Sequence, residues 1–196
     1  MNGVTLNLTL ELERVIAGIV REVEEFGHIS PEKVMLCVST TRSGGIHGTF
    51  AKIHPLRFEN GSRTTTMRRG RRSILCEMRA ITRGEVEILY VIYFLVPRFL
   101  DLPLRDKLIT LFHELYHISP SFDGDIRRFP GKNYAHGSSR KKYNALMAKL
   151  VEGYLRRTED RHRLEFLEGD SEAIRSRHGA IVARKMAAPK IRILGS

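Results

Sequence analysis

The apolar positions of the chain recur at two spacings, which separate helical from extended segments in its first half. Residues 6–26 carry an apolar stripe at helical spacing between acidic and basic side chains, which predicts an amphipathic helix. Residues 34–39, 46–53 and 73–80 have the composition and alternation of short strands. Residues 86–96, VEILYVIYFLV, are almost continuously apolar. We therefore expect them to form a buried strand of the main sheet.

The segment after this strand returns to helical spacing. Leu104, Leu108, Leu111 and Leu115 recur every three or four residues, with charged residues between them. We expect a helix of roughly 16 residues that begins after an N-cap at Asp101 and ends before Ser119-Pro120. This helix and the first one would pack against the sheet.

The last third of the chain is less regular. Residues 145–155 and 159–167 are predicted to be helical, and residues 171–196 form a basic segment that is either a partly ordered tail or a last helix. The pattern as a whole predicts an α+β fold with a small mixed sheet. We expect one domain over residues 1–170, followed by the basic tail.

Composition narrows the class of protein. The chain has 196 residues, of which 42% are hydrophobic and 28% charged, as in soluble globular proteins. It has no apolar run long enough to span a membrane, and its start lacks the pattern of a signal peptide. Cys37 and Cys76 are too few and too far apart for a disulfide framework. These features predict a cytoplasmic protein without a membrane partner.

The charge balance suggests an anionic partner. The net charge is +11 and the sequence pI is about 10.0, so the surface attracts polyanions, above all nucleic acid. Residues 60–72 are the most basic stretch and contain no acidic residue. We interpret them as a loop or hairpin tip that either binds an anion or is a solvated connection, with candidate contacts at Arg63, Arg68, Arg69, Arg71 and Arg72.

The sequence HELYH lies near the end of the predicted 101–118 helix. Helical spacing places His113 and His117 about one turn apart on the same face, where two imidazoles can bind one Zn²⁺. Glu114, beside the first histidine, can then act as the general base that deprotonates a water bound to the metal. The alternative is an exposed helix with solvated side chains.

A catalytic zinc usually has three protein ligands, so a third must come from elsewhere. His136 is the leading candidate because it follows a loop of turn-forming residues and precedes Gly137, which permits a close approach. Asp123, Asp125 and Glu152 are the other candidates. Donors to an oxyanion, or side chains that orient the ligands, would come from Tyr134, Tyr143, Arg127, Asp123 and Asp125.

These residues predict zinc-dependent hydrolysis of a peptide bond in a protein or peptide substrate, which could be associated with nucleic acid. Two alternatives remain open. One is a basic nucleic-acid-binding or regulatory protein in which the metal is structural or absent. The other is zinc-dependent hydrolysis of a non-peptide amide, which would use the same ligands.

The segment from Tyr90 to Tyr143 resembles a phage-type metallopeptidase family that also occurs in some bacteria and archaea. The shared order is an apolar strand, the PRF turn at residues 97–99, the HExxH helix, HISP and FDG at residues 117–124, and a later HG at His136-Gly137. The segment is more distantly similar to SprT-like zincins, although paired cysteines are lacking. The resemblance implies a zincin-like fold, zinc ligands at His113, His117 and His136, and Glu114 as general base.

Overall fold

A three-stranded mixed sheet lies at the centre of the structure, which is a computed structural model that describes residues 4–41, 48–129, 140–159 and 161–195. Strand β2 (Val34–Thr40) pairs in parallel with β8 (Tyr90–Val96), and β3 (Ala51–Pro55) pairs antiparallel with the other side of β8. The order is therefore β2-β8-β3, and β3 is an edge strand among the described residues. The mixed α+β class expected from the sequence is confirmed.

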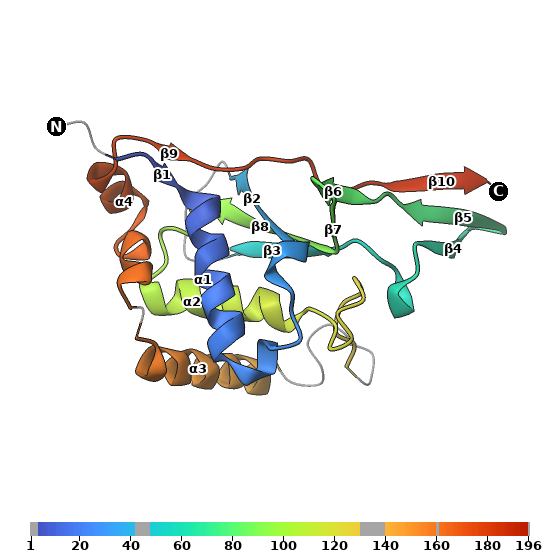
Figure 1. Cartoon of the computed structure of the whole chain (residues 1–196). Coiled ribbons are helices and arrows are strands. Elements are labelled where there is room, and N and C mark those ends of the chain that lie inside the picture. The colour runs from blue at the N-terminus through green and yellow to red at the C-terminus, as the bar shows by residue number, and fades with distance from the viewer. Residues whose placement is uncertain (1–3, 42–47, 130–139, 160, 196) are drawn as a thin grey trace.

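Two helices cover one face of this sheet (Figure 1). Helix α1 (Leu8–Glu22) and helix α2 (Leu104–Tyr116) bury their apolar stripes in one core with Tyr90, Ile92 and Phe94 of β8. The alternate residues of β8 enter a second, smaller cluster on the opposite face, formed by Met35, Cys37, Leu56, Ile88, Val91 and Tyr93. Burial on both faces explains why this strand is continuously apolar.

The helix boundaries differ from the sequence prediction for local reasons. Helix α1 is capped by the side chain of Asn7 and ends at Val23, which adopts an extended conformation before a 3₁₀ turn, η1 (Glu24–Phe26). Helix α2 begins directly after Pro103, not at an Asp101 cap. The Asp101 carboxylate instead accepts a hydrogen bond from the Ser171 backbone at 3.2 Å. The predicted N-cap is therefore wrong.

Helix α3 (Arg140–Arg157) packs against α2 through Tyr154, whose ring lies 5.8 Å from that of Phe112. It is followed by the 3₁₀ segment η4 (Arg161–Leu167) and helix α4 (Ser171–Arg177). None of the described helices is long and apolar enough to cross a lipid bilayer.

The strand predicted over residues 86–96 is divided in two. Strand β7 (Val86–Ile88) pairs with β6 (Ile81–Arg83), whereas β8 belongs to the central sheet. Leu89 separates them, because its backbone donates to Lys33 and accepts from Leu56, both outside the two ladders. These hydrogen bonds depend on residues far away in the sequence, so periodicity alone could not reveal the break.

A second three-stranded sheet extends away from the helices as an arm (Figure 1). We define the arm as β4 (Thr64–Arg69), β5 (Arg72–Met78) and β10 (Ile191–Gly195), with β5 in the middle. The sequence predicted a loop or a hairpin tip over residues 60–72, and the structure has a hairpin of β4 and β5 there. The short 3₁₀ turns η2 (Pro31–Lys33) and η3 (Glu59–Gly61) precede β2 and β4.

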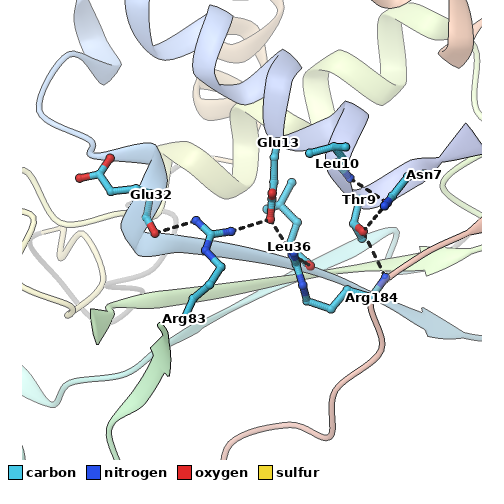
Figure 2. A network of polar contacts seen from close by, with 8 residues as sticks. All are labelled: Asn7, Thr9, Leu10, Glu13, Glu32, Leu36, Arg83 and Arg184. Carbon is cyan, nitrogen blue, oxygen red and sulfur yellow. Dashed lines mark hydrogen bonds and ion pairs between the residues drawn. The ribbon is translucent and has the colours of Figure 1, made fainter. Parts of the chain in front are cut away.

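The basic C-terminal segment is integrated into the fold instead of trailing from it. Strand β9 (Ile181–Val182) pairs in parallel with β1 (Leu6–Asn7), and Arg184 then binds α1 and β2 (Figure 2). The Arg184 guanidinium contacts the Glu13 carboxylate and donates to the Leu36 carbonyl oxygen at 3.0 Å. Arg83 contacts the same carboxylate at 3.1 Å, so Glu13 joins three distant segments.

Candidate active site

Helix α2 brings the two histidines of HELYH together at its C-terminal end. The Nε2 atoms of His113 and His117 lie 3.0 Å apart, and the planes of the two rings are inclined by 76°. His117 is the C-cap residue but keeps right-handed helical backbone angles, so the one-turn relation to His113 is preserved. Two Zn–N bonds of about 2.0–2.1 Å at a tetrahedral angle would separate the nitrogens by roughly 3.3 Å. The spacing therefore fits a shared zinc ion.

Glu114 lies beside this pair and is almost completely buried, with 6% of its surface exposed. Burial raises the pKa of its carboxyl group to about 7, an increase that a hydrogen bond from the Ile53 backbone partly opposes. A carboxyl group with a pKa near neutrality can both accept and release a proton, which is the property that a general base needs.

The histidines and Glu114 line a cleft of about 840 Å³ between α2 and the edge strand β3. This volume is within the usual range for ligand-binding clefts. The rest of the wall comes from three parts of the chain: residues 48–55 before and along β3, Ile109 and Thr110 on the preceding turn of α2, and Ile126 and Asn144 beyond it. The candidate site is therefore bounded by a sheet edge on one side and a helix on the other.

Tyr143 of α3 supports the two imidazole rings. Its ring centroid lies 4.9 Å from that of His113 in an edge-to-face arrangement, and 6.0 Å from that of His117. Its hydroxyl donates to the His113 carbonyl oxygen at 3.3 Å. Burial raises the pKa of this phenol, so it stays neutral. These contacts fit the predicted role of orienting the ligands, since the hydroxyl is engaged with the helix backbone.

The loop after the histidines is held by the other predicted residues. Asp125 accepts hydrogen bonds from Ile126 and Arg128, and Asp123 accepts one from the Asp125 backbone. The Arg127 backbone donates to the His117 carbonyl oxygen at 2.7 Å. Its guanidinium donates to the Tyr116 carbonyl oxygen and lies 4.2 Å above the Tyr116 ring. These contacts fix the loop against the end of α2.

No third metal ligand joins the histidine pair within the described residues. No three His, Cys, Asp or Glu side chains gather there in a metal-binding group, which argues against Asp123, Asp125 and Glu152. Glu152 instead pairs with Arg105 at 2.7 Å on the surface. His136, the leading candidate from the sequence, and Tyr134 both lie outside the described residues.

The five arginines predicted to bind polyanions do not lie in one environment. Arg63 pairs with Glu87 at 2.9 Å at the base of the arm. The other four, Arg68, Arg69, Arg71 and Arg72, surround the exposed turn that joins β4 to β5. The structure therefore separates one arginine that has an internal partner from four at the end of the arm.

Sequence reasoning missed the contribution of β3 to the site. Ile53 contacts the buried carboxyl group of Glu114, and its neighbours form one wall of the cleft. The strand was expected at residues 46–53, but it begins at Ala51 and its contact with α2 depends on pairing with β8. Only the alternation of residues 46–53 indicated a strand there, and nothing local indicated which element it faces.

Compared with known proteins, the chain matches no protein-family model, no curated protein and no solved structure.

Proposed function

We propose that the protein is a zinc-dependent metallopeptidase with a zincin-like arrangement of the active site. The observation that carries this proposal is the His113–His117 pair, with Nε2 atoms 3.0 Å apart, next to a buried Glu114 in an open cleft. A solvated helical face would not bury a carboxyl group until only 6% of the residue is exposed, as Glu114 is here. The donor set and its spacing both suit zinc.

His113 and His117 would hold the ion, with the third ligand expected from His136. Zinc held there supplies Lewis acidity, which increases the acidity of water and the electrophilicity of a carbonyl group. The Glu114 carboxylate accepts the proton of the attacking water and later delivers it to the leaving amine. Tyr143 keeps both imidazole rings oriented through ring contacts and its bond to the helix backbone.

The cleft wall formed by β3 suggests how a substrate would bind. An edge strand has backbone N–H and C=O groups directed away from its sheet, and an extended peptide can pair with them. Because the Ile53 backbone of β3 hydrogen-bonds to Glu114, a peptide paired with the rest of this edge would place its backbone carbonyl groups next to the histidine pair. This arrangement favours a peptide over a non-peptide amide.

The direct test is peptide hydrolysis by the full chain with added zinc, measured on a library of unstructured peptides by mass spectrometry. We expect Glu114→Gln to lower the rate by at least about a hundredfold, because a general base contributes roughly that much or more. The control is Glu152→Gln, the same chemical change at a carboxylate that pairs with Arg105 on the surface. It should retain full activity.

Cleavage that is insensitive to both Glu114→Gln and a chelator would contradict the proposal. Zinc binding with no hydrolysis of any peptide would favour the alternative of a binding or regulatory protein on the same scaffold.

A further inference from the structure

The end of the arm is a two-stranded ribbon. Strand β10 makes its last pair with β5 at Gly195 and Leu75, so beyond this point only β4 and β5 continue among the described residues. A two-residue turn joins them at Gly70, whose φ of +64° is the conformation that such hairpin turns require. The ribbon therefore extends roughly 10 Å beyond the third strand. We define residues 68–72 as the arm tip.

The arm tip carries four positive charges that the protein does not neutralise. Arg68, Arg69, Arg71 and Arg72 are all exposed, and none of them makes an ion pair with a described residue. No acidic residue occurs between positions 60 and 76. Arginines at the base of the arm differ, since Arg63 and Arg192 lie 2.9 and 3.9 Å from glutamate carboxylates.

The register of the hairpin distributes these charges over both faces of the ribbon. Arg69 is paired with Arg72, and directly paired residues in an antiparallel ladder project to the same face. Arg68 is paired with Ser73 and projects to the opposite face. Arg71 extends from the turn. Guanidinium groups can therefore reach anions on either side of the ribbon.

The dimensions of the tip suit a DNA groove. Two adjacent strands lie about 4.8 Å apart, and the major groove of B-form DNA, about 12 Å wide, admits a two-stranded ribbon. Arginines on both faces would then reach the phosphates on the two walls of the groove. Arginine also matches phosphate geometry by donating two parallel hydrogen bonds.

The residues around the tip argue against a single-stranded nucleic acid as the partner. No aromatic residue occurs between positions 59 and 89. Single-stranded nucleic acid is usually bound by stacking its bases on aromatic side chains. The tip lacks the side chains that this mode of binding needs.

From these observations we infer that the arm tip is a binding site for double-stranded DNA that contacts the phosphate backbone without reading a specific sequence. This inference does not depend on the proposed peptidase activity, because the tip and the cleft use separate residues. A peptidase with such an arm would be recruited to proteins bound to DNA.

Binding of the full chain to a fluorescent 30-base-pair duplex tests this inference. We expect replacement of all four tip arginines by Gln to weaken binding at 0.1 M salt by at least about tenfold. The slope of log K against log salt concentration should flatten by about 3 to 4, since each lost phosphate contact contributes about 0.9. The matched control replaces Lys149, Arg156, Arg175 and Lys185, four exposed cations outside the arm, and should keep nearly all of the affinity.

Equal losses of DNA affinity in the tip variant and the control variant would overturn the inference, because they would mean that net charge alone attracts DNA. Preference for a single strand over the duplex would also overturn it. So would tip-dependent binding to phosphatidylserine vesicles that DNA does not displace. Circular dichroism of the tip variant should match that of the unmodified chain, because the replaced side chains are exposed and make no ion pair with a described residue.

Discussion

Lys107 holds its ammonium group inside the protein, although lysine is one of the residues least often buried. The residue has no exposed surface, and its Nζ donates to the carbonyl oxygens of Leu167 and Gly169. Burial lowers the pKa of this group to about 8. It therefore attaches the segment at the end of η4 to helix α2 at the cost of a desolvated charge.

This cost predicts a pH dependence of stability. Between pH 8 and 10.5 the unfolded chain retains the Lys107 proton that the folded chain has lost, so the free energy of unfolding rises with pH. Between pH 7 and pH 10, the free energy of unfolding of the unmodified protein should rise by about 2–3 kcal/mol relative to that of Lys107→Met. Urea denaturation at several pH values measures this difference. Lys149→Met is the exposed control, and its free energy of unfolding should keep a constant difference from that of the unmodified protein across this pH range. A constant difference for Lys107→Met as well would contradict the prediction.

Gly124 is required by a close contact between the loop after the histidines and Arg57, which lies between β3 and η3. Its φ is +90°, and a Cβ atom there would lie 2.5 Å from Cγ of Arg57. Its N–H also donates to the Tyr90 hydroxyl at 2.9 Å, which joins the loop to the central sheet. A side chain would have to displace either Arg57 or the loop itself.

We therefore expect Gly124→Ala to lower the free energy of unfolding by about 2–4 kcal/mol, as for other strained and overpacked positions. Gly84→Ala is the matched control, since Gly84 has a φ of +61° with no atom within 4 Å of its added Cβ. That control should cost only about 1 kcal/mol of backbone strain. Thermal denaturation compares the stability of the two variants. Equal losses of stability would show that the contact with Arg57 is unimportant.

For single residues of the candidate site, the sequence was enough to predict the positions that depend on local helix geometry. The spacing of His113 and His117 is enough to bring their rings together on a helix, and the structure has them 3.0 Å apart. The contact between Ile53 and Glu114 could not be predicted, because it joins segments 61 residues apart. The third ligand expected at His136 stays a prediction.

Among the elements, the C-terminal segment depends most on one side chain. Glu13 of α1 accepts from Arg83 and Arg184, and the Arg184 backbone also donates to the Thr9 hydroxyl at 3.1 Å (Figure 2). The carboxylate is only 20% exposed, so its ion pairs are less screened than those of surface residues.

Glu13→Gln should therefore destabilise the protein by about 1–3 kcal/mol and increase amide hydrogen exchange in residues 181–195. Glu11→Gln is the control, because Glu11 pairs with Arg14 three residues further along the same helix, and Arg14 is 60% exposed. Its effect should stay below about 0.5 kcal/mol. If exchange in the C-terminal segment does not change in Glu13→Gln, this network does not anchor it.

The elements that were predicted well are those whose pattern is repeated over many residues. Helices α1 and α2 were expected close to their observed positions because their apolar stripes cover several turns. The arm strand β10 and the pair β1–β9 were not foreseen, since each is short and exists through a partner distant in sequence. The break at Leu89 has the same cause.

For the whole molecule, the two candidate sites lie on different parts of the fold. The cleft is formed where α2 crosses the edge of the central sheet, whereas the arginine-rich arm tip belongs to a separate sheet that extends from it (Figure 1). Catalysis and DNA binding should therefore be separable by mutation, with Glu114→Gln leaving the affinity for DNA unchanged.

The proposed peptidase activity depends on the binding of a zinc ion by His113 and His117. Zinc titration of the metal-free chain against a chromophoric chelator measures the stoichiometry and affinity of the site directly. We predict one high-affinity ion per chain, an affinity reduced by more than about a hundredfold in His113→Ala and in His117→Ala, and no change in the surface control His162→Ala. Absence of zinc binding, or binding that survives the loss of both histidines, would contradict the account.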